Sequence, residues 1–339
     1  MKLSVCIPTY NFGSFIGDTL DSIISQLNPD VEVIILDGGS VDDTAQVVSH
    51  RSKKCKNICF YHQEFRGGIA QDIDSLVDLA SGDYIWLFSA DDIMLPGSID
   101  KILCSIQTSY DIYLCESMLC SFDMKPIKRN MPLKGVNKLN VFDFSNFHDR
   151  MLYFSSANTT EAFFSYLSGP IFKKDIWIAN KSIAPLHFQT VWIVSLRLMN
   201  SFLTDTKICY LGEILIHKRG DNDSFLEDGY VKRYALSING FQEISSYFFQ
   251  KDTIESFHIR RALRNDITLS HFLNLKNDLI KESSNKDLRE LNDLVYNQYS
   301  DSSILNSIRI VVYFYIPIWL YSYIKVLFGF MKKTIKGIK

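Results

Sequence analysis

The stretch YIWLFSADDIMLP, residues 84–96, joins an apolar run to a pair of acids. The run ends at Phe88, and Ser89, Ala90, Asp91 and Asp92 follow directly. A buried strand that stops at adjacent carboxylates is costly unless the charges meet water, a cation or a partner. Open α/β sheets bind their ligands at the carboxyl ends of strands. We therefore interpret Asp91 and Asp92 as a cation and phosphate site at the end of a strand.

Short strands and amphipathic helices alternate in the chain before this stretch. The apolar patterns predict strands at residues 3–7, 31–36, 58–62 and 84–88, with helices between them at residues 14–27, 43–52 and up to 79. Such alternation predicts an α/β fold with a mostly parallel sheet that helices cover on both faces. The first apolar run stops at Pro8, which makes it too short for the core of a signal peptide.

The composition excludes several classes of protein. The 339 residues are 47% hydrophobic, which suits one large domain or two. A formal net charge of -2 gives no indication of a nucleic-acid partner. The seven cysteines are odd in number and include no C-x-x-C pair. Reduced, buried thiols in a cytoplasmic protein are therefore favoured over disulfides or metal ligands.

The chain after residue 96 is predicted to be less regular. We expect helices at 97–107 and 188–202, strands at 110–120 and 208–216, and a polar patch at 217–224. The segment 122–147 is either a loop over the site or an inserted hairpin. The predicted divisions are an α/β domain at 1–225, a helical extension at 226–303 and a distinct C-terminal segment at 304–339.

The C-terminal segment is rich in aromatic and basic residues. Residues 310–324 carry no charge, Arg309 and Lys325 flank them, and further lysines follow. The run is shorter than the roughly 20 residues that a spanning helix needs. Aromatic residues beside clustered lysines favour the membrane interface. We expect in-plane association with a membrane, with a core or oligomer helix and a true span as the alternatives.

Three motifs resemble the family 2 glycosyltransferases of the GT-A fold. They are SVCIPTYN at 4–11, VIILDGGSVDDT at 33–44 and ASGDYIWLFSADD at 80–92. The resemblance implies a Rossmann-like sheet, a nucleotide-sugar donor and inversion of the anomeric centre. Beyond residue 96 it rests only on residues 168–177 and 217–224.

The resemblance also implies roles for individual positions. Asp91 would be the second acid of an Asp-X-Asp element that holds Mg²⁺ or Mn²⁺ on the donor diphosphate. Arg219 would pair with the diphosphate, and His217 would supply a further metal ligand. The remaining donor-binding positions are Pro8, Thr9, Tyr10, Asn11, Asp37, Gly67, Gly68, Gln71, Asp74, Ser89 and Ala90.

The chain departs from the family pattern at three places. Ser89 replaces the first acid of the Asp-X-Asp element, and Gly38 replaces the second acid of an Asp-Asp-Gly-Ser element. Many relatives carry an acidic pair that includes the catalytic base, but residues 185–190 contain no acid. His187 is our candidate base because the ordinary pKa of histidine lies near neutrality, and Asp92 is a second candidate for acid–base work. The alternatives are a histidine packed at a helix start and a solvated strand-end charge.

The preferred interpretation is a cytoplasmic enzyme that is peripheral on the inner face of the cell membrane. Its acceptor would be a lipid-linked oligosaccharide, as in bacterial O-antigen synthesis. Ser89 and His187 are similar to features of enzymes that transfer deoxy or dideoxy sugars, such as abequosyltransferases, which implies a CDP-sugar donor. A non-catalytic GT-A-like membrane scaffold is an alternative. A sugar nucleotidyltransferase is disfavoured because the loop at residues 9–13 has no basic residue.

Overall fold

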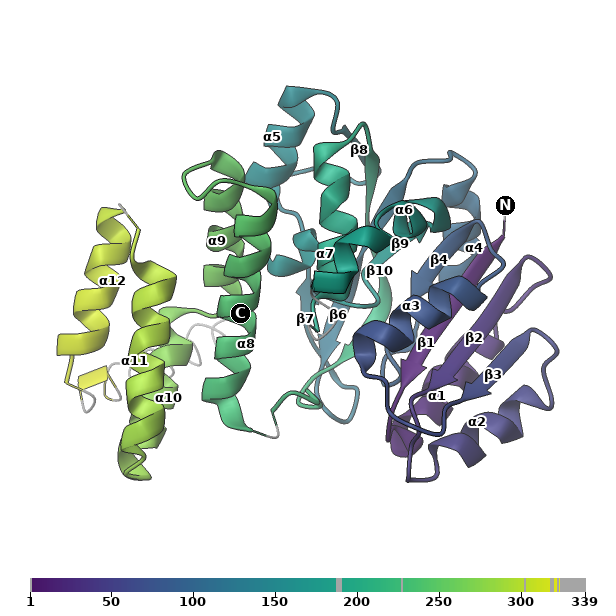
Figure 1. Ribbon diagram of the computed structural model, residues 1–339, viewed down its shortest axis with the longest axis horizontal. Coiled ribbons are helices and arrows are strands. Elements are labelled where there is room, and N and C mark those ends of the chain that lie inside the picture. Colours follow the sequence, from purple (N-terminus) through teal and green to yellow (C-terminus); the bar gives the residue numbers. More distant parts are fainter. Residues whose placement is uncertain are drawn as a thin grey trace, which may run out of the picture. The chain divides into compact units, whose positions relative to one another are not determined.

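The computed structural model describes residues 2–186, 191–226, 228–301, 303–317, 320, 321 and 323 (Figure 1). These residues form two compact units, which we treat separately. The first contains residues 1–223 and 244–259, and the second contains residues 224–243 and 260–339.

A ten-stranded sheet forms the centre of the first unit. Its strands lie in the order β3-β2-β1-β4-β9-β6-β10-β5, with β7 beside β6 and β8 beside β10. Their bounds are β1 Leu3–Thr9, β2 Val31–Asp37, β3 Ile58–His62, β4 Tyr84–Leu87, β5 Ile93–Met94, β6 Ile112–Cys120, β7 Pro126–Asn130, β8 Asn140–Asp143, β9 Pro170–Lys173 and β10 Lys207–Arg219. β1, β2, β3, β4, β6 and β10 run in one direction, whereas the other strands pair antiparallel. The expected α/β fold with a mostly parallel sheet is confirmed.

Helices cover both faces of this sheet. Alternate residues of β1, such as Val5 and Ile7, share a buried cluster with α1, α2 and α4, whereas the Cys6 thiol points to α3. The helices of the first unit are α1 Gly13–Ile24, α2 Thr44–Ser52, α3 Ile69–Leu79, α4 Ser98–Ile106, α5 Phe147–Ser156, α6 Lys174–Ala179 and α7 Ile193–Met199. Short 3₁₀ turns lie at η1 Thr160–Phe163, η2 Lys181–Leu186 and η3 Asn200–Leu203.

The register of the strands brings their carboxyl ends to one edge. Thr9 pairs with Asp37, and Asp37 pairs with His62. β4 runs parallel to β1 with Leu87 opposite Cys6, so the acids after β4 lie at the same edge. All four side chains of β4 are buried, which explains why its sequence is continuously apolar.

Two segments decide or correct the sequence-based expectation. Residues 122–147 contain β7, which forms a hairpin with β6, the second of the two expected alternatives, and a further strand, β8, which pairs with β10. β10 continues to Arg219, so His217 and Arg219 lie within a strand and not in a loop after one. The reason is pairing, because this part of β10 is hydrogen-bonded to β6 and β5 on its two sides. Backbone pairing outweighs the polar character of these side chains.

The C-terminal helices are α8 Gly229–Phe248, α9 Ile254–Asp266, α10 Leu269–Lys281, α11 Asn285–Tyr299 and α12 Ile304–Tyr315. Within the second unit, Phe272 packs against Tyr234 and Tyr299, and an ion pair joins Arg264 to Asp301. A helical C-terminal region is therefore confirmed. No helix among the described residues is both long and apolar enough to cross a membrane.

Candidate active site at the carboxyl edge of the sheet

The loop after β4 carries the two acids that the sequence singles out. Asp91 and Asp92 are 7% and 2% exposed, so neither is an ordinary surface charge. The Thr19 hydroxyl of α1 lies 3.0 Å from the Ala90 carbonyl oxygen and 2.8 Å from that of Asp92. These contacts fix the backbone of the loop against α1, and Ala90 serves this packing with a buried side chain.

Asp92 is turned into the protein. Its Oδ2 accepts hydrogen bonds from the Tyr166 hydroxyl at 2.5 Å and the Ser168 hydroxyl at 3.0 Å. Its Oδ1 accepts one from the Arg219 backbone N–H at 3.0 Å. Burial, and then the charge of Asp91, raise the pKa of Asp92 to about 7. The carboxyl group therefore ties three chain segments together, and sequence reasoning had identified neither Tyr166 nor the role of Ser168.

Asp91 is held by two neutral donors. The Ser89 hydroxyl donates to its Oδ1 at 2.6 Å, and the Asn222 amide donates to its Oδ2 at 2.8 Å. Each carboxylate oxygen has two acceptor sites, so one on each oxygen remains for a ligand. Ser89, which replaces an acid of the family pattern, thus orients Asp91 instead of adding a second charge. Asn222 lies in the polar patch and was not predicted as a site residue.

Arg219 lies beside the same loop. Its Nε donates to the Asp91 carbonyl oxygen at 3.0 Å, and its Nη1 donates to the carbonyl oxygen of Phe122. The guanidinium also lies over the Phe15 ring, 4.9 Å from the centroid. His217 lies two residues earlier on β10 and is partly exposed. Among the described residues, no hydrogen bond or ion pair joins its imidazole to Asp91.

Asp37 marks the other end of this edge. Its side chain is fully buried. Oδ1 accepts from the Ser40 backbone N–H at 3.0 Å and from the Ser40 hydroxyl at 2.5 Å, whereas Oδ2 lies 2.9 Å from His62 Nδ1. His62 was not singled out in the sequence, although its place at the end of β3 could have indicated it.

The loop after β1 is tied to the loop after β2. Asn11 has φ 59°, and its amide oxygen accepts from the Val41 N–H at 2.9 Å. Its own N–H donates to the Ser40 hydroxyl at 2.7 Å. The Arg66 guanidinium lies 4.1 Å from the centroid of the Tyr10 ring. Pro8 and Thr9 belong to β1 itself, where both are buried.

Comparisons with known proteins identify the family of this chain. Residues 4–168 match the model of the family described as glycosyl transferase family 2. The abequosyltransferase RfbV of Salmonella typhimurium is 30% identical over 274 residues, which cover 78% of this chain and 79% of RfbV. The chain belongs to glycosyltransferase family 2. It is therefore a glycosyltransferase, as the three N-terminal motifs predicted.

Two further proteins extend the comparison. A Campylobacter jejuni protein named GalNAc(5)-diNAcBac-PP-undecaprenol beta-1,3-glucosyltransferase is 30% identical over 110 residues, which cover 32% of this chain and 36% of that protein. The S. aureus protein TarS 1–349, solved in complex with UDP-GlcNAc, has a TM-score of 0.58 at 16% identity. The match covers 88% of this chain and 81% of TarS 1–349, and it supports the GT-A fold.

The predicted glycine loop of this glycosyltransferase leads into α3. Gly68 has φ 99° and precedes the helix, and a Cβ on Gly67 would lie 2.8 Å from Gln71 Oε1. Asp74, which was expected beside them, lies elsewhere. It pairs with the buried Arg197 at 2.5 Å and accepts from Trp177 Nε1 at 2.8 Å. Asp74 therefore lies on the side of α3 that faces α6 and α7, which carry Trp177 and Arg197.

The candidate base of this glycosyltransferase, His187, lies outside the described residues. No group of three or more His, Cys, Asp or Glu side chains in the described part of the chain is arranged as a metal site. A metal at Asp91 would therefore take most of its ligands from the donor diphosphate and water.

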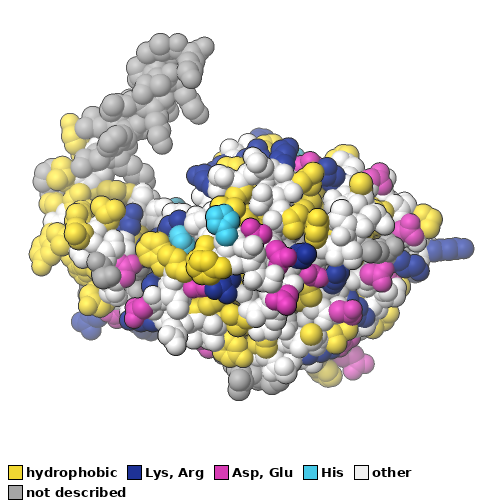
Figure 2. All heavy atoms as spheres, turned by 90° about the horizontal axis from the view of Figure 1, so that it is seen from above, with side chains coloured by type: hydrophobic (Ala, Val, Ile, Leu, Met, Phe, Trp, Pro, Cys, Tyr) yellow, Lys and Arg dark blue, Asp and Glu magenta, His cyan; other side chains and the backbone are white. Residues whose placement is uncertain are grey.

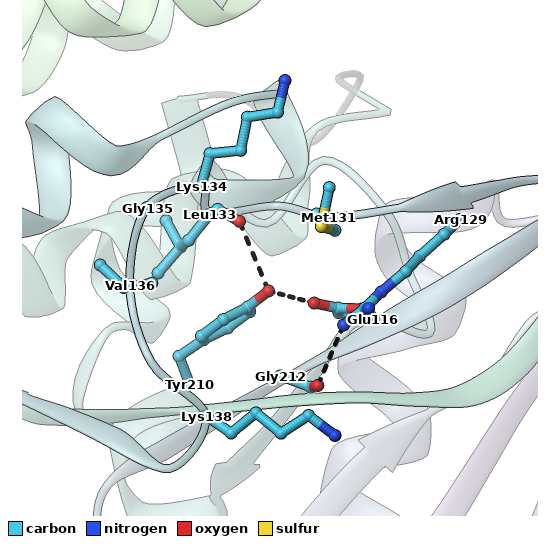
Figure 3. A pocket seen from close by; sticks show the side chains of 10 residues that line it. All are labelled: Glu116, Arg129, Met131, Leu133, Lys134, Gly135, Val136, Lys138, Tyr210 and Gly212. Carbon is cyan, nitrogen blue, oxygen red and sulfur yellow. Dashed lines mark hydrogen bonds and ion pairs between the residues drawn. The ribbon is translucent and has the colours of Figure 1, made fainter.

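A cavity of about 270 Å³ lies farther along the sheet (Figure 3). Glu116 is buried beside it, where Arg129 and the Tyr210 hydroxyl both bond to the carboxylate (Figure 3). Arg129 also donates to the Gly212 carbonyl oxygen at 3.2 Å. The polar groups of Glu116, Arg129 and Tyr210 thus satisfy one another.

Proposed function

We propose that this glycosyltransferase moves a sugar from a nucleotide-sugar donor to a lipid-linked oligosaccharide, with inversion at the anomeric centre. The observation that carries the proposal is the placement of Asp91, oriented by Ser89 and Asn222, at the same sheet edge as Asp37. The name of RfbV and the UDP-GlcNAc complex of TarS support a nucleotide-sugar donor. The name of the Campylobacter jejuni relative supports a lipid-linked acceptor. In its finer form, the proposal is that the donor is a CDP-linked deoxy or dideoxy sugar such as CDP-abequose.

The chain's residues fit a divalent metal. Mg²⁺ and Mn²⁺ prefer carboxylate, phosphate and water oxygens, and Asp91 retains a free acceptor site on each oxygen. When bound, the ion would neutralise charge on the leaving diphosphate. Asp91 would hold it, and His217 is the further ligand that we propose.

Arg219 and Asp92 lie beside Asp91, and we propose a role for each. Arginine has five N–H donors, and the described contacts of the side chain use only its Nε and Nη1. The remaining donors suit a diphosphate oxygen. We propose that Asp92 positions Tyr166, Ser168 and β10, since its oxygens already accept three hydrogen bonds. His187 remains the proposed base for the acceptor hydroxyl.

We also propose that α12 brings the enzyme to the cytoplasmic face of the membrane. Four residues at helical spacing form an exposed apolar stripe: Ile304, Ile308, Val311 and Tyr315 are 78%, 51%, 54% and 80% exposed. Figure 2 shows hydrophobic side chains gathered at the left, on the part of the chain that includes α12. Such a face, followed in the sequence by several lysines, suits an anionic bilayer surface.

Activity with nucleotide sugars tests the main proposal. Purified full-length protein is incubated with Mn²⁺, a lipid-linked acceptor and UDP-, GDP-, CDP- or dTDP-sugars in turn. The proposal expects transfer or hydrolysis of at least one donor, and loss of that activity in Asp91→Ala. If no donor reacts while the protein still binds membranes, the scaffold alternative is favoured instead.

Vesicle sedimentation tests the membrane proposal. The full-length double variant Ile308→Glu/Val311→Glu should leave the pellet of vesicles that contain phosphatidylglycerol. Ile127→Glu is the matched control, because Ile127 is 62% exposed but lies on β7. If both variants sedimented with the vesicles to the same extent as the unaltered protein, the proposed role of α12 in membrane binding would be contradicted.

A further inference from the structure

Asp72 carries a buried carboxyl oxygen that no described contact uses. It lies in the first turn of α3 and is 4% exposed. Its Oδ1 has no hydrogen-bond partner among the described residues. A buried polar atom without a partner costs free energy, and such atoms in native proteins often mark functional sites. Neither the fold nor the proposed metal site accounts for this one.

Glycines surround the Asp72 carboxylate. A Cβ on Gly38 would lie 2.9 Å from Asp72 Oδ2, and one on Gly67 would lie 3.6 Å from Oδ1. The carboxylate therefore lies between the end of β2 and the loop that leads into α3. Gly38 is also the position at which the family pattern has an acid. The Asp72 carboxylate, which comes from α3, thus lies where the side chain of an acid at position 38 would begin.

The charges nearby place Asp72 and Asp37 in one electrostatic environment. Burial raises the pKa of Asp72 above its usual range, and the charge of Asp37 adds to the rise. Gln63 and the charge of Arg66 act on the pKa of Asp72 in the opposite direction. Ionised carboxylates only accept hydrogen bonds. Two of them at the end of β2 therefore favour a ligand that presents N–H groups.

We propose that Asp72 is a specificity-determining residue for the donor nucleotide and that its carboxylate accepts a hydrogen bond from an exocyclic amino group of the base. The inference rests on the proposed nucleotide-sugar donor. Cytosine carries such an amino group at C4 and guanine at C2. Uracil and thymine carry carbonyl oxygens at C2 and C4, which a carboxylate repels, and have only the ring N3–H as a base donor. Because Oδ1 is closed to solvent, the base reaches it when the loop at Gly67 and Gly68 shifts.

Nucleotide binding by Asp72→Asn tests the assignment. The replacement keeps the shape of the side chain but adds an N–H₂ donor that can face a carbonyl oxygen. Affinities for CDP, GDP, UDP and dTDP are measured by calorimetry with Mn²⁺ present, on folded full-length protein whose melting temperature is recorded. We expect the unaltered protein to prefer CDP or GDP over UDP by about tenfold or more, and Asp72→Asn to lose most of that ratio. The affinities for CDP and GDP identify whether the site binds cytosine or guanine.

Asp78→Asn is the matched control, because Asp78 lies on the same helix but is exposed. Its nucleotide preference should equal that of the unaltered protein. An unchanged ratio in Asp72→Asn, or a preference for UDP or dTDP in the unaltered protein, overturns the role of Asp72 while the donor proposal stands. Absence of binding to all four nucleotides overturns both. A purely structural role would lower the melting temperature and weaken all four nucleotides equally.

Discussion

The acids after β4 and the acids near the end of β2 differ in how the protein itself satisfies them. Asp91 and Asp92 together accept hydrogen bonds from Ser89, Asn222, Tyr166, Ser168 and the Arg219 backbone. At the β2 end, both oxygens of Asp37 have partners in Ser40 and His62, whereas Asp72 keeps an oxygen without a partner among the described residues. The protein itself orients both carboxylates of the first region, whereas the second region keeps a buried acceptor oxygen that a ligand can use. This division suits a donor whose diphosphate is common to many enzymes and whose base is the part to be discriminated.

Asp91→Asn should break the first region most severely. We expect the rate of sugar transfer to fall about 100-fold or more, because the charge that would hold a metal on the diphosphate is lost. Binding of a nucleoside monophosphate should change little, since the β2 end is untouched. Initial rates and monophosphate affinities measure the two effects. Asp100→Asn on α4 is the control, because Asp100 is exposed. An equal loss of monophosphate binding would show that the two regions are not separate.

Tyr166→Phe should test how strongly the first region is organised. Removing the hydroxyl leaves Oδ2 of the buried Asp92 with Ser168 alone, at a cost of about 2 kcal/mol in the free energy of unfolding. Tyr153→Phe is the matched control, because the Tyr153 hydroxyl donates to the neutral carbonyl oxygen of Ala162 at 2.6 Å. That change should cost about 1 kcal/mol, since hydrogen bonds to neutral groups contribute less. Urea unfolding at about pH 8.5, above the pKa of Asp92, measures both. Equal losses would mean that Asp92 adds no special rigidity.

Asp37→Asn should weaken the β2 end. An amide cannot accept from Ser40 and bond to His62 in the same way, so we expect nucleoside affinity to fall about tenfold. Diphosphates and monophosphates should be affected alike, in contrast to Asp91→Asn. Calorimetry with both ligands measures this, and the exposed Asp43→Asn serves as the control. If only the diphosphate were weakened, Asp37 would act through the phosphate end.

The two regions also differ in how far the sequence could predict them. Strand periodicity and the acids that follow Phe88 were sufficient for the parallel strands, their common edge and the place of Asp91, but not for the antiparallel strands β5, β8 and β9. The partners Tyr166 and Asn222 lie far along the chain. They reach the site because β9, which follows Tyr166, pairs with β4, and because β10, which precedes Asn222, pairs with β5. The expectation for Asp74 took its place on α3 from the family pattern without considering which side of the helix it faces. Its partner Arg197 is likewise distant in sequence.

Ser89→Ala should give the smallest of these effects and the sharpest test of how the first region is built. The hydroxyl lies 2.6 Å from Asp91 Oδ1 and orients it without adding charge. Its loss should raise the Mn²⁺ concentration needed for half-maximal transfer by about threefold to tenfold, because a hydrogen bond to a charged group contributes about 1.5–3 kcal/mol and part of it is recovered by water. The maximal rate at saturating Mn²⁺ should stay close to that of the unaltered enzyme, since Asp91 itself remains. Ser105→Ala is the control, because the Ser105 hydroxyl donates to the Lys101 carbonyl oxygen of its own helix. A fall in maximal rate with an unchanged Mn²⁺ requirement would mean that Ser89 contacts the donor directly. The acids after β4 would then not be fully oriented by the protein itself, and in this respect they would resemble the acids near the end of β2.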